Sequence, residues 1–230
     1  NSLIGSSGGA LIAVAYACGH SPKKILQFFK DFNPYKHEKF LLAARDPHLV
    51  DQKEWIKYAT KVTEGRDLSE LDYKVRVQAT NIRTQNIDYL SQGDAATAVI
   101  ASSAFPGLVK PVEFLGEKYI DGDVDIEYGA EVHRDLGSEV VVGLSAGRVE
   151  LEKGGGSPLL RIGKRLIRPI EIMQTNMERL ELELNPIDML IEGYGKNYKL
   201  FDFKYLEQIY EQGYKLSKKK VGELKKLLNI

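Results

Sequence analysis

The stretch SLIGSSGGALIAVAYACG, residues 2–19, constrains the fold of this 230-residue chain more than any other. Apolar residues lead into a glycine and serine cluster, Gly5–Gly9, which is followed by the small and apolar run Ala10–Cys18. Glycine and serine are poor choices inside a helix or a strand, so the cluster indicates a break between two elements. We predict a strand that ends near Leu3 and Ile4, a sharp turn, and a helix that is apolar on all sides and therefore buried.

The turn has the pattern G-x-S-x-G with Ser7 at its centre. In a nucleophile elbow a strand turns sharply into a helix and presents the hydroxyl of the central serine. Gly5 and Gly9 would leave room for this packing, and the N–H of Gly8 would point to where an oxyanion forms. A plain strand-to-helix turn and an anion site at the helix N-terminus remain open as alternatives. A Walker A loop is excluded because no Gly-Lys-Ser/Thr follows.

A serine nucleophile needs a base, and histidine is the usual one. The chain has four histidines, which are His20, His37, His48 and His133. We interpret the first three as surface residues in charged or loop-like surroundings. His133 has the chain order of a serine–acid–histidine triad, but it lies in a predicted amphipathic helix and we interpret it as part of a solvated face. A serine esterase with a Ser7–Asp121–His133 triad stays an alternative.

Asp121 lies in YIDGDVD, after an apolar strand end and before Gly122. A catalytic side chain on a sharp turn is presented at such a place. The alternating aspartates that begin at Asp121 also resemble a calcium loop. That interpretation fails because the sixth position is Ile126 instead of glycine and the twelfth is Val132 instead of glutamate.

Helix and strand signals alternate along the rest of the chain, with a glycine-rich loop or linker at 153–158. The predicted helices are 22–32 with Ser21 as N-cap, 35–65, 95–104 with Asp94 as N-cap, one from about 130, one after 158, and 204–228. The predicted strands are 73–82, a hairpin over 109–122 that turns at Gly116, a buried strand at 138–145, and 186–193. This alternation predicts an α/β protein with a mostly parallel sheet.

The helix after 158 has apolar residues at spacings of three and four, which predicts one packing stripe. The stripe consists of Leu159, Ile162, Leu166, Ile170, Met173, Met177 and Leu180. Four basic residues on the same helix would suit contact with an anionic membrane surface, although we favour a solvated face opposite the stripe. These residues are Arg161, Lys164, Arg165 and Arg168.

Composition narrows the range of partners. Lys and Arg together number 32, as do Asp and Glu, so the net charge is zero and no nucleic-acid partner is expected. Cys18 is the only cysteine, which excludes an internal disulfide and fits a reducing compartment. We therefore expect a cytoplasmic protein that makes at most transient contact with a membrane surface. We expect no cofactor and no metal, and the oligomeric state is left open.

Three motifs in order resemble those of the patatin-like phospholipases. They are GSSGGAL at 5–11, ASSAFPG at 101–107 and YIDGD at 119–123. VRVQATNI at 75–82 and YEQGY at 210–214 are also similar, so the resemblance covers essentially the whole chain. It implies a single three-layer α/β/α domain over residues 1–230.

The resemblance also implies a lipid acyl hydrolase that cleaves phospholipid or lysophospholipid esters. Ser7 would be the nucleophile and Asp121 its partner, with no histidine and an acyl-serine intermediate. A non-catalytic lipid- or anion-binding module of the same fold is an alternative. The chain departs from the family at Asp123, where glycine or alanine is usual. We also expect the family's N-terminal strand and glycine-rich loop to be missing from these residues, and Gly154–Gly156 not to replace them.

Overall fold

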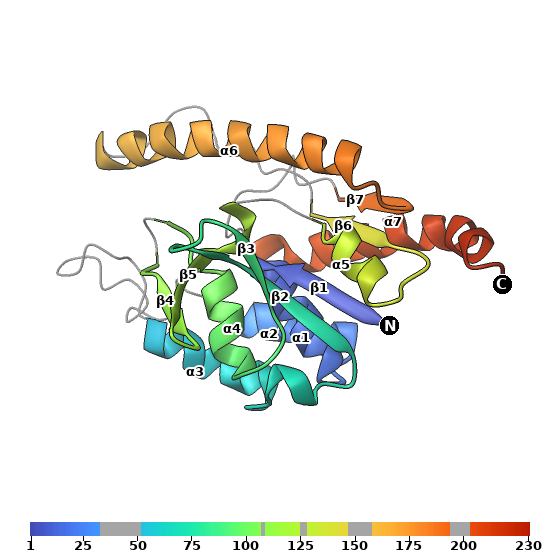
Figure 1. Ribbon diagram of the computed structural model, residues 1–230, viewed down its shortest axis with the longest axis horizontal. Helices are drawn as coiled ribbons and strands as arrows, with labels where there is room; N and C mark the ends of the chain where they lie inside the picture. The colour runs from blue at the N-terminus through green and yellow to red at the C-terminus, as the bar shows by residue number, and fades with distance from the viewer. Residues whose placement is uncertain (33–51, 107–108, 125–127, 147–157, 194–202) are drawn as a thin grey trace. The chain divides into compact units, whose positions relative to one another are not determined.

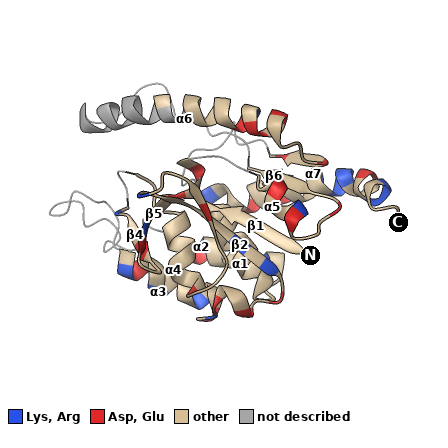
Figure 2. Cartoon of the chain, viewed as in Figure 1, with Lys and Arg blue, Asp and Glu red and all other residues tan. Residues whose placement is uncertain are grey.

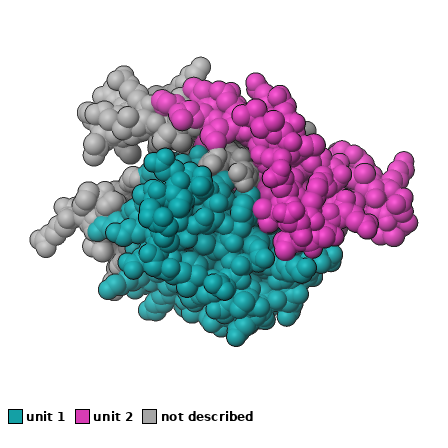
Figure 3. All heavy atoms as spheres, in the orientation of Figure 1, with its two compact units in different colours: residues 1–126 teal, residues 127–230 magenta. Residues whose placement is uncertain are grey.

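The chain forms two compact units, residues 1–126 and 127–230 (Figure 3). The structure, a computed structural model, describes residues 1–32, 52–106, 109–124, 128–146, 158–193 and 203–230. Residues 153–157 of the linker predicted at 153–158 therefore lie outside the described residues, as do His37 and His48. The side chains of the four basic residues between 161 and 168 also lie outside the described part. The prediction of one domain over residues 1–230 stays a prediction.

Unit 1 builds a mixed sheet with helices on one face (Figure 1). Its elements are β1 (Ser2–Ser6), α1 (Ser7–Ala17), α2 (Pro22–Asp31), α3 (Gln52–Thr63), η2 (Leu68–Glu70), β2 (Lys74–Asn81), β3 (Ile87–Leu90), α4 (Ala95–Ser102), β4 (Val112–Phe114), β5 (Glu117–Asp121) and η3 (Gly122–Val124). The strand order is β1-β2-β5-β4, and β3 also pairs with β2. The β1–β2 pair is parallel, whereas the β2–β3, β2–β5 and β4–β5 pairs are antiparallel. The α/β class is confirmed, and a second helical layer on the other face stays a prediction.

Local capping signals place several of these elements where the sequence predicts them. The Ser21 side chain accepts a hydrogen bond from the N–H of Lys24, and α2 begins at the next residue after the cap. Asp94 accepts from the N–H of Thr97 at 2.7 Å and begins α4 in the same way. Gly116 has φ 84° in the turn between β4 and β5, a conformation that glycine adopts without strain.

The sequence did not predict β3. This strand forms a hairpin with β2, in which Thr80 pairs with Ile87. Asn81 stabilises the turn, because its Oδ1 accepts from the N–H of Arg83 and its Nδ2 donates to Asp88, both at 2.9 Å. A strand of four residues that contains an aspartate is too short to show a repeating pattern, so pairing with β2 defines it.

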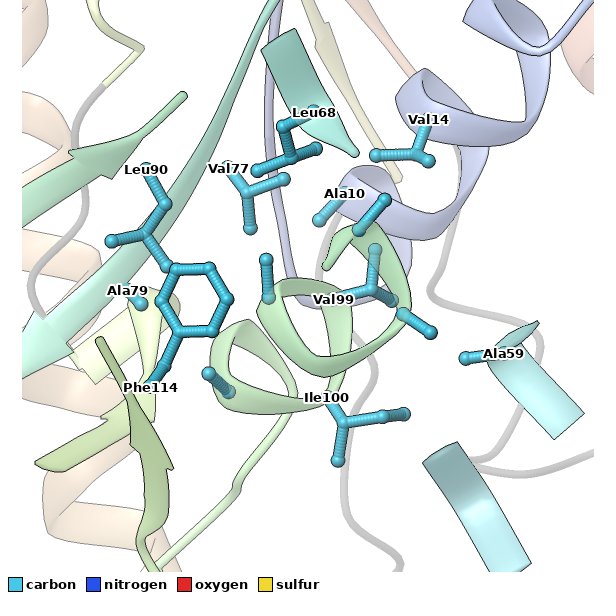
Figure 4. Close-up of a cluster of buried hydrophobic side chains, with 14 of the residues drawn as sticks. Ala10, Val14, Ala59, Leu68, Val77, Ala79, Leu90, Val99, Ile100 and Phe114 are labelled. Carbon is cyan, nitrogen blue, oxygen red and sulfur yellow. The ribbon is translucent and has the colours of Figure 1, made fainter. Parts of the chain in front are cut away.

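The core of unit 1 lies between the sheet and the helices α1 and α4 (Figure 4). Small side chains let these helices approach the sheet closely. Buried core residues include Ala10 and Val14 of α1, Val77 and Ala79 of β2, and Val99 and Ile100 of α4. Helix α3 packs against α1 and α4 from outside.

The prediction that α1 is buried on all sides is wrong. Ile12 is 49% exposed and Tyr16 is 43% exposed. These residues are four apart and therefore share one face of the helix, which points away from the core residues Ala10 and Val14. An apolar composition shows which residues can be buried but not which face receives a covering element.

Unit 2 is built around one parallel strand pair. Its elements are α5 (Ala130–Asp135), β6 (Val142–Ser145), α6 (Pro158–Leu184), β7 (Met189–Glu192), η5 (Phe203–Tyr205) and α7 (Leu206–Leu227). β6 and β7 pair in parallel, as expected for the predicted strand type, although Leu144 is 71% exposed and β6 is not fully buried. The Tyr128 hydroxyl donates to Glu178 at 2.6 Å and ties the start of the unit to α6. None of the helices in the described ranges has both the length and the apolar character needed to cross a bilayer.

The predicted packing stripe on α6 is exposed at two of its three described side chains, and the third, Met177, is half-buried. Met173 is 62% exposed and Leu180 is 54% exposed. Spacings of three and four identify residues that share a helix face, but they do not show that another element covers it. This expectation is therefore corrected for the C-terminal half of α6.

Candidate active site

Ser7 stands where β1 becomes α1. Its φ is 49°, in the left-handed region that residues other than glycine rarely adopt. Ser6, immediately before it, is still extended, with φ −120° and ψ 147°. The chain therefore turns from strand to helix at a single residue, and the strain of that turn is concentrated at Ser7.

Gly5 is required by the close approach of the first helical turn. A Cβ at this position would lie 2.6 Å from the carbonyl oxygen of Gly9. At Gly8 and Gly9, an added Cβ would have no heavy atom of the described residues within 4 Å. The expectation that Gly5 and Gly9 both leave room for packing thus holds for Gly5 and is wrong for Gly9.

The topology of β2 brings Ser7 to Asp121 across 114 positions of sequence. β3 pairs with residues 77–80 of β2, so β1 and β5 must share the opposite edge of that strand. β1 runs along this edge until Ser6 pairs with Gln78, and β5 runs against it until Asp121 pairs with Ala79. The two strands therefore meet end to end, with Ser7 following one and Asp121 ending the other.

The two side chains form a hydrogen bond at that meeting point. Ser7 Oγ donates to Asp121 Oδ2 at 3.1 Å. Asp121 is 3% exposed, and its backbone is held on both sides, by its own N–H donating to the Ala104 carbonyl and by the Thr80 hydroxyl donating to its carbonyl. Its second carboxylate oxygen accepts from the N–H of Asp123 at 2.9 Å. The carboxylate is thus fixed in the orientation that faces Ser7.

Gly122 packs against β2, the strand with which both β1 and β5 pair. A Cβ at this position would lie 2.5 Å from the backbone carbonyl oxygen of Gln78 and 2.5 Å from the Ser6 hydroxyl. Neither the strand backbone nor the residue beside Ser7 can move without displacing the site. The glycine after Asp121 is therefore a requirement of space.

Ser102 is a site residue that the sequence reasoning did not assign. Its Oγ accepts a hydrogen bond from the backbone N–H of Ser7 at 2.8 Å, and the residue is fully buried at the end of α4. The same segment supplies the Ala104 carbonyl that holds the N–H of Asp121. The motif ASSAFPG at 101–107 thus contacts both Ser7 and Asp121, which explains why it accompanies the other two motifs.

Burial changes the acidity of Asp121. Loss of water around its carboxylate raises the pKa of Asp121 to about 7, and the negative charge of Asp123 acts in the same direction. The hydrogen bonds from the Asp123 N–H and the Ser7 hydroxyl oppose this rise. The carboxylate can therefore accept a proton near neutral pH, which a solvated aspartate does poorly. The departure from the family pattern at Asp123 thus has an electrostatic effect on the site.

The first turn of α1 offers donors for a developing negative charge. The N–H groups of a first helical turn have no acceptor within the helix. The N–H of Ser7 already donates to Ser102 Oγ, so the next N–H along the turn that could donate to an oxyanion is that of Gly8. The helix dipole adds a favourable field at the same place. Gly8 is exposed, which leaves its backbone accessible to a substrate.

The described histidines have different surroundings from those expected. His20 is not a surface residue, because its side chain is 14% exposed, its Nε2 is 2.9 Å from the Val62 carbonyl and its ring contacts Phe28. His133, on α5 in unit 2, is half-buried instead of lying on a solvated face, and burial lowers the pKa of its ring. The Ser7 hydroxyl and Asp121 form their bond within unit 1.

Cys18 and the acidic residues give no further chemistry in the described ranges. The Cys18 thiol lies 3.5 Å from the Thr63 carbonyl, and burial raises the pKa of the thiol, so it behaves as a packed residue. Within the parts of the chain that the structure describes, no three His, Cys, Asp or Glu side chains are grouped so that they could hold a metal ion.

A family model described as patatin-like phospholipase matches residues 1–124, and the chain belongs to this family. The match covers more than half of the chain and ends next to the boundary between the two units. It contains Ser7, Ser102, Asp121 and the glycines around them. Proteins of this family are lipid hydrolases, so the chain is a hydrolase of lipid esters by family.

Proposed function

We propose that the protein is a lipid acyl hydrolase that cleaves carboxylic esters of phospholipids or lysophospholipids, with Ser7 as nucleophile and Asp121 as its base. The observation that carries the proposal is the 3.1 Å hydrogen bond from Ser7 Oγ to a carboxylate that is 3% exposed. The strained φ of Ser7 and the family membership support the same function.

In the first half-reaction, Ser7 Oγ attacks the ester carbonyl carbon while its proton passes to Asp121 Oδ2. The carbonyl oxygen becomes an oxyanion, which accepts a hydrogen bond from the N–H of Gly8. The tetrahedral intermediate then collapses. The bond to the alcohol oxygen breaks, Asp121 returns its proton to that oxygen, and an acyl-serine ester remains on Ser7.

In the second half-reaction, a water molecule gives a proton to Asp121 and attacks the acyl carbonyl carbon. The new intermediate collapses with cleavage of the bond to Ser7 Oγ, which takes the proton back from Asp121. The products are the fatty acid and the free serine. A carboxylate with a pKa near 7 suits both directions of transfer, because it accepts and releases a proton with little cost at neutral pH.

The test is hydrolysis of a panel of p-nitrophenyl esters and phospholipids by the wild-type protein and by Ser7→Ala. We expect the substitution to abolish turnover while the melting temperature stays near that of the wild type. Ser103→Ala is the matched control, since the Ser103 hydroxyl bonds only to the Val99 carbonyl of its own helix among the contacts of the described residues. Its turnover should remain close to that of the wild type.

His133→Gln separates the dyad from a Ser–Asp–His triad. The dyad predicts that this variant keeps wild-type turnover, since the Ser7 hydroxyl donates to Asp121 without an intervening imidazole. Loss of turnover by His133→Gln in a folded protein would show that a histidine takes part. Full turnover by Ser7→Ala would show that the reaction occurs elsewhere.

A further inference from the structure

Helix α7 presents a line of exposed apolar side chains that its own unit does not cover. Tyr214 and Val221 of α7 and Leu228, the residue that caps its C-terminus, are 55%, 44% and 45% exposed. Residues seven apart on a helix differ by only about 20° around its axis, so these three lie along one line. Helix α7 contains no buried residue, although its neighbour β7 contacts it. We call the line Tyr214, Val221 and Leu228 the α7 ribbon.

Lysines border the α7 ribbon along its length. Lys218 and Lys225 each follow a ribbon residue by four positions, about 40° around the helix, and both are exposed. The Lys218 ammonium lies 5.8 Å from the centre of the Tyr214 ring. Residues 214–230 hold six lysines and one glutamate. The ribbon is thus an apolar strip with positive charge at its edge.

The exposed apolar residues of α6 have the opposite electrostatic setting. Met173 and Leu180 are also exposed, but residues 171–184 hold four glutamates and one arginine. Figure 2 shows the acidic residues at the described end of α6 and the basic residues at the C-terminal end of α7. Charge therefore distinguishes α7 from the described C-terminal half of α6, and of these two segments α7 is the one complementary to a negatively charged surface.

We propose that the α7 ribbon docks on an anionic lipid surface, with the helix lying in the plane of the interface. The apolar residues would enter the boundary between headgroups and acyl chains, and Lys218 and Lys225 would reach the anionic headgroups along their extended stems. An amphipathic helix with aromatic and aliphatic residues on one side and lysines beside them binds such surfaces in two ways. Its apolar side chains are buried in the interface, and its lysines are attracted to the anionic lipids. The inference rests on the proposed function, because the substrate is then a lipid ester presented by such a surface.

The experiment is co-sedimentation with vesicles, using Ser7→Ala protein so that no lipid is hydrolysed. One set of vesicles contains phosphatidylcholine alone and the other a mixture with anionic phosphatidylglycerol. We expect binding to the mixed vesicles and at least about thirtyfold weaker binding after Lys218→Glu/Lys225→Glu, since each lysine near the surface contributes about fivefold. Val221→Ser should also weaken binding while the net charge is unchanged.

The matched control is Lys219→Glu/Lys226→Glu, which changes the charge equally on the opposite side of the same helix. These lysines would stand about 10 Å farther from the surface, a distance over which salt screens their effect, so most of the binding should remain. Circular dichroism would verify that each variant keeps its helix content.

Several results would overturn the inference. Equal loss in both double variants would show general charge attraction, and absence of binding to mixed vesicles would remove the docking surface. A dimer in sedimentation velocity that Val221→Ser dissociates would assign the ribbon to a second copy of the chain. Hydrolysis of a soluble p-nitrophenyl ester by protein with Ser7 intact separates the two proposals, and the Lys218→Glu/Lys225→Glu variant should keep this turnover while it loses vesicle binding. If the protein with both lysines turns over the ester but does not bind mixed vesicles, docking alone is rejected. If it binds mixed vesicles but does not turn over the ester, the proposed function alone is rejected.

Discussion

Replacement of Asp121 by asparagine should stabilise the protein at neutral and alkaline pH while it abolishes ester hydrolysis. The two side chains have nearly the same shape, and asparagine can keep both hydrogen bonds of the site. Its Oδ1 would accept from the N–H of Asp123, and its Nδ2 would donate to Ser7 Oγ in place of the present bond. What the substitution removes is a negative charge that is 3% exposed.

The magnitude follows from the pKa of Asp121, which is raised from 3.8 to about 7 by burial and by the charge of Asp123. Each unit is worth about 1.36 kcal/mol, so the charged form costs the folded state up to about 4 kcal/mol. Because the folded pKa is the higher one, the wild type loses this stability as pH rises from about 4 to about 7. Above that window the loss is complete, and below it both proteins carry a neutral side chain.

The assay is urea denaturation of the wild type and Asp121→Asn from about pH 4 to about pH 9. Titrating groups that do not interact with Asp121 act equally on both proteins, so they cancel in the difference, whereas Asp123 interacts with it. The difference should be near zero at the acidic end, grow from about pH 4 to about pH 7 and then stay constant. Asp123→Asn should give a smaller gain in the same window, because it removes one of the two causes of the raised pKa. A difference that is independent of pH, or a variant less stable than the wild type at pH 8, would refute the reasoning.

Three further predictions concern packing around the site and on α6. Gly5→Ala should unfold or inactivate the protein, because its Cβ would meet the helix backbone at 2.6 Å, whereas Gly9→Ala should leave turnover and melting temperature near wild type or slightly raise the latter. Ser102→Ala should cost about 1 to 3 kcal/mol in urea denaturation and lower kcat, because the N–H of the nucleophile loses its buried partner. Ser103→Ala is the matched control for Ser102→Ala and should change the free energy of unfolding and kcat less. Met173→Asp should change the melting temperature by no more than about 2 °C, since this side chain is 62% exposed, and a large fall would show that the stripe is covered after all.

The parts of the fold that local chemistry determines could be predicted from the sequence. Ser21 and Asp94 identify helix starts because their side chains satisfy N–H groups of the next turn. The cluster around Ser7 indicates a boundary between two elements because glycine and serine are poor choices inside a helix or a strand, and the boundary falls between Ser6 and Ser7. These signals act within a few residues, so no knowledge of the tertiary structure is needed to use them.

The parts that depend on distant contacts could not be predicted in this way. The role of Ser102 follows only from the position of α4 beside Ser7, and Ser7 precedes Ser102 by 95 positions in the chain. The short strand β3 exists because β2 offers it an edge, and the exposed face of α1 at Ile12 depends on which elements reach it. The unequal need for Gly5 and Gly9 likewise appears only when the neighbouring backbone is in place. The pairing of Ser7 with Asp121 was reached through the family resemblance, since nothing near either residue indicates the other.

The central claim is that Ser7 is the nucleophile, and covalent labelling tests it most directly. A fluorophosphonate reacts with an activated serine hydroxyl, and peptide mapping by mass spectrometry locates the adduct. We predict one adduct, on Ser7, that is absent from Ser7→Ala and strongly reduced in Asp121→Asn, because the carboxylate activates the hydroxyl at 3.1 Å. An adduct on another serine, or equal labelling of the wild type and Ser7→Ala, would contradict the account.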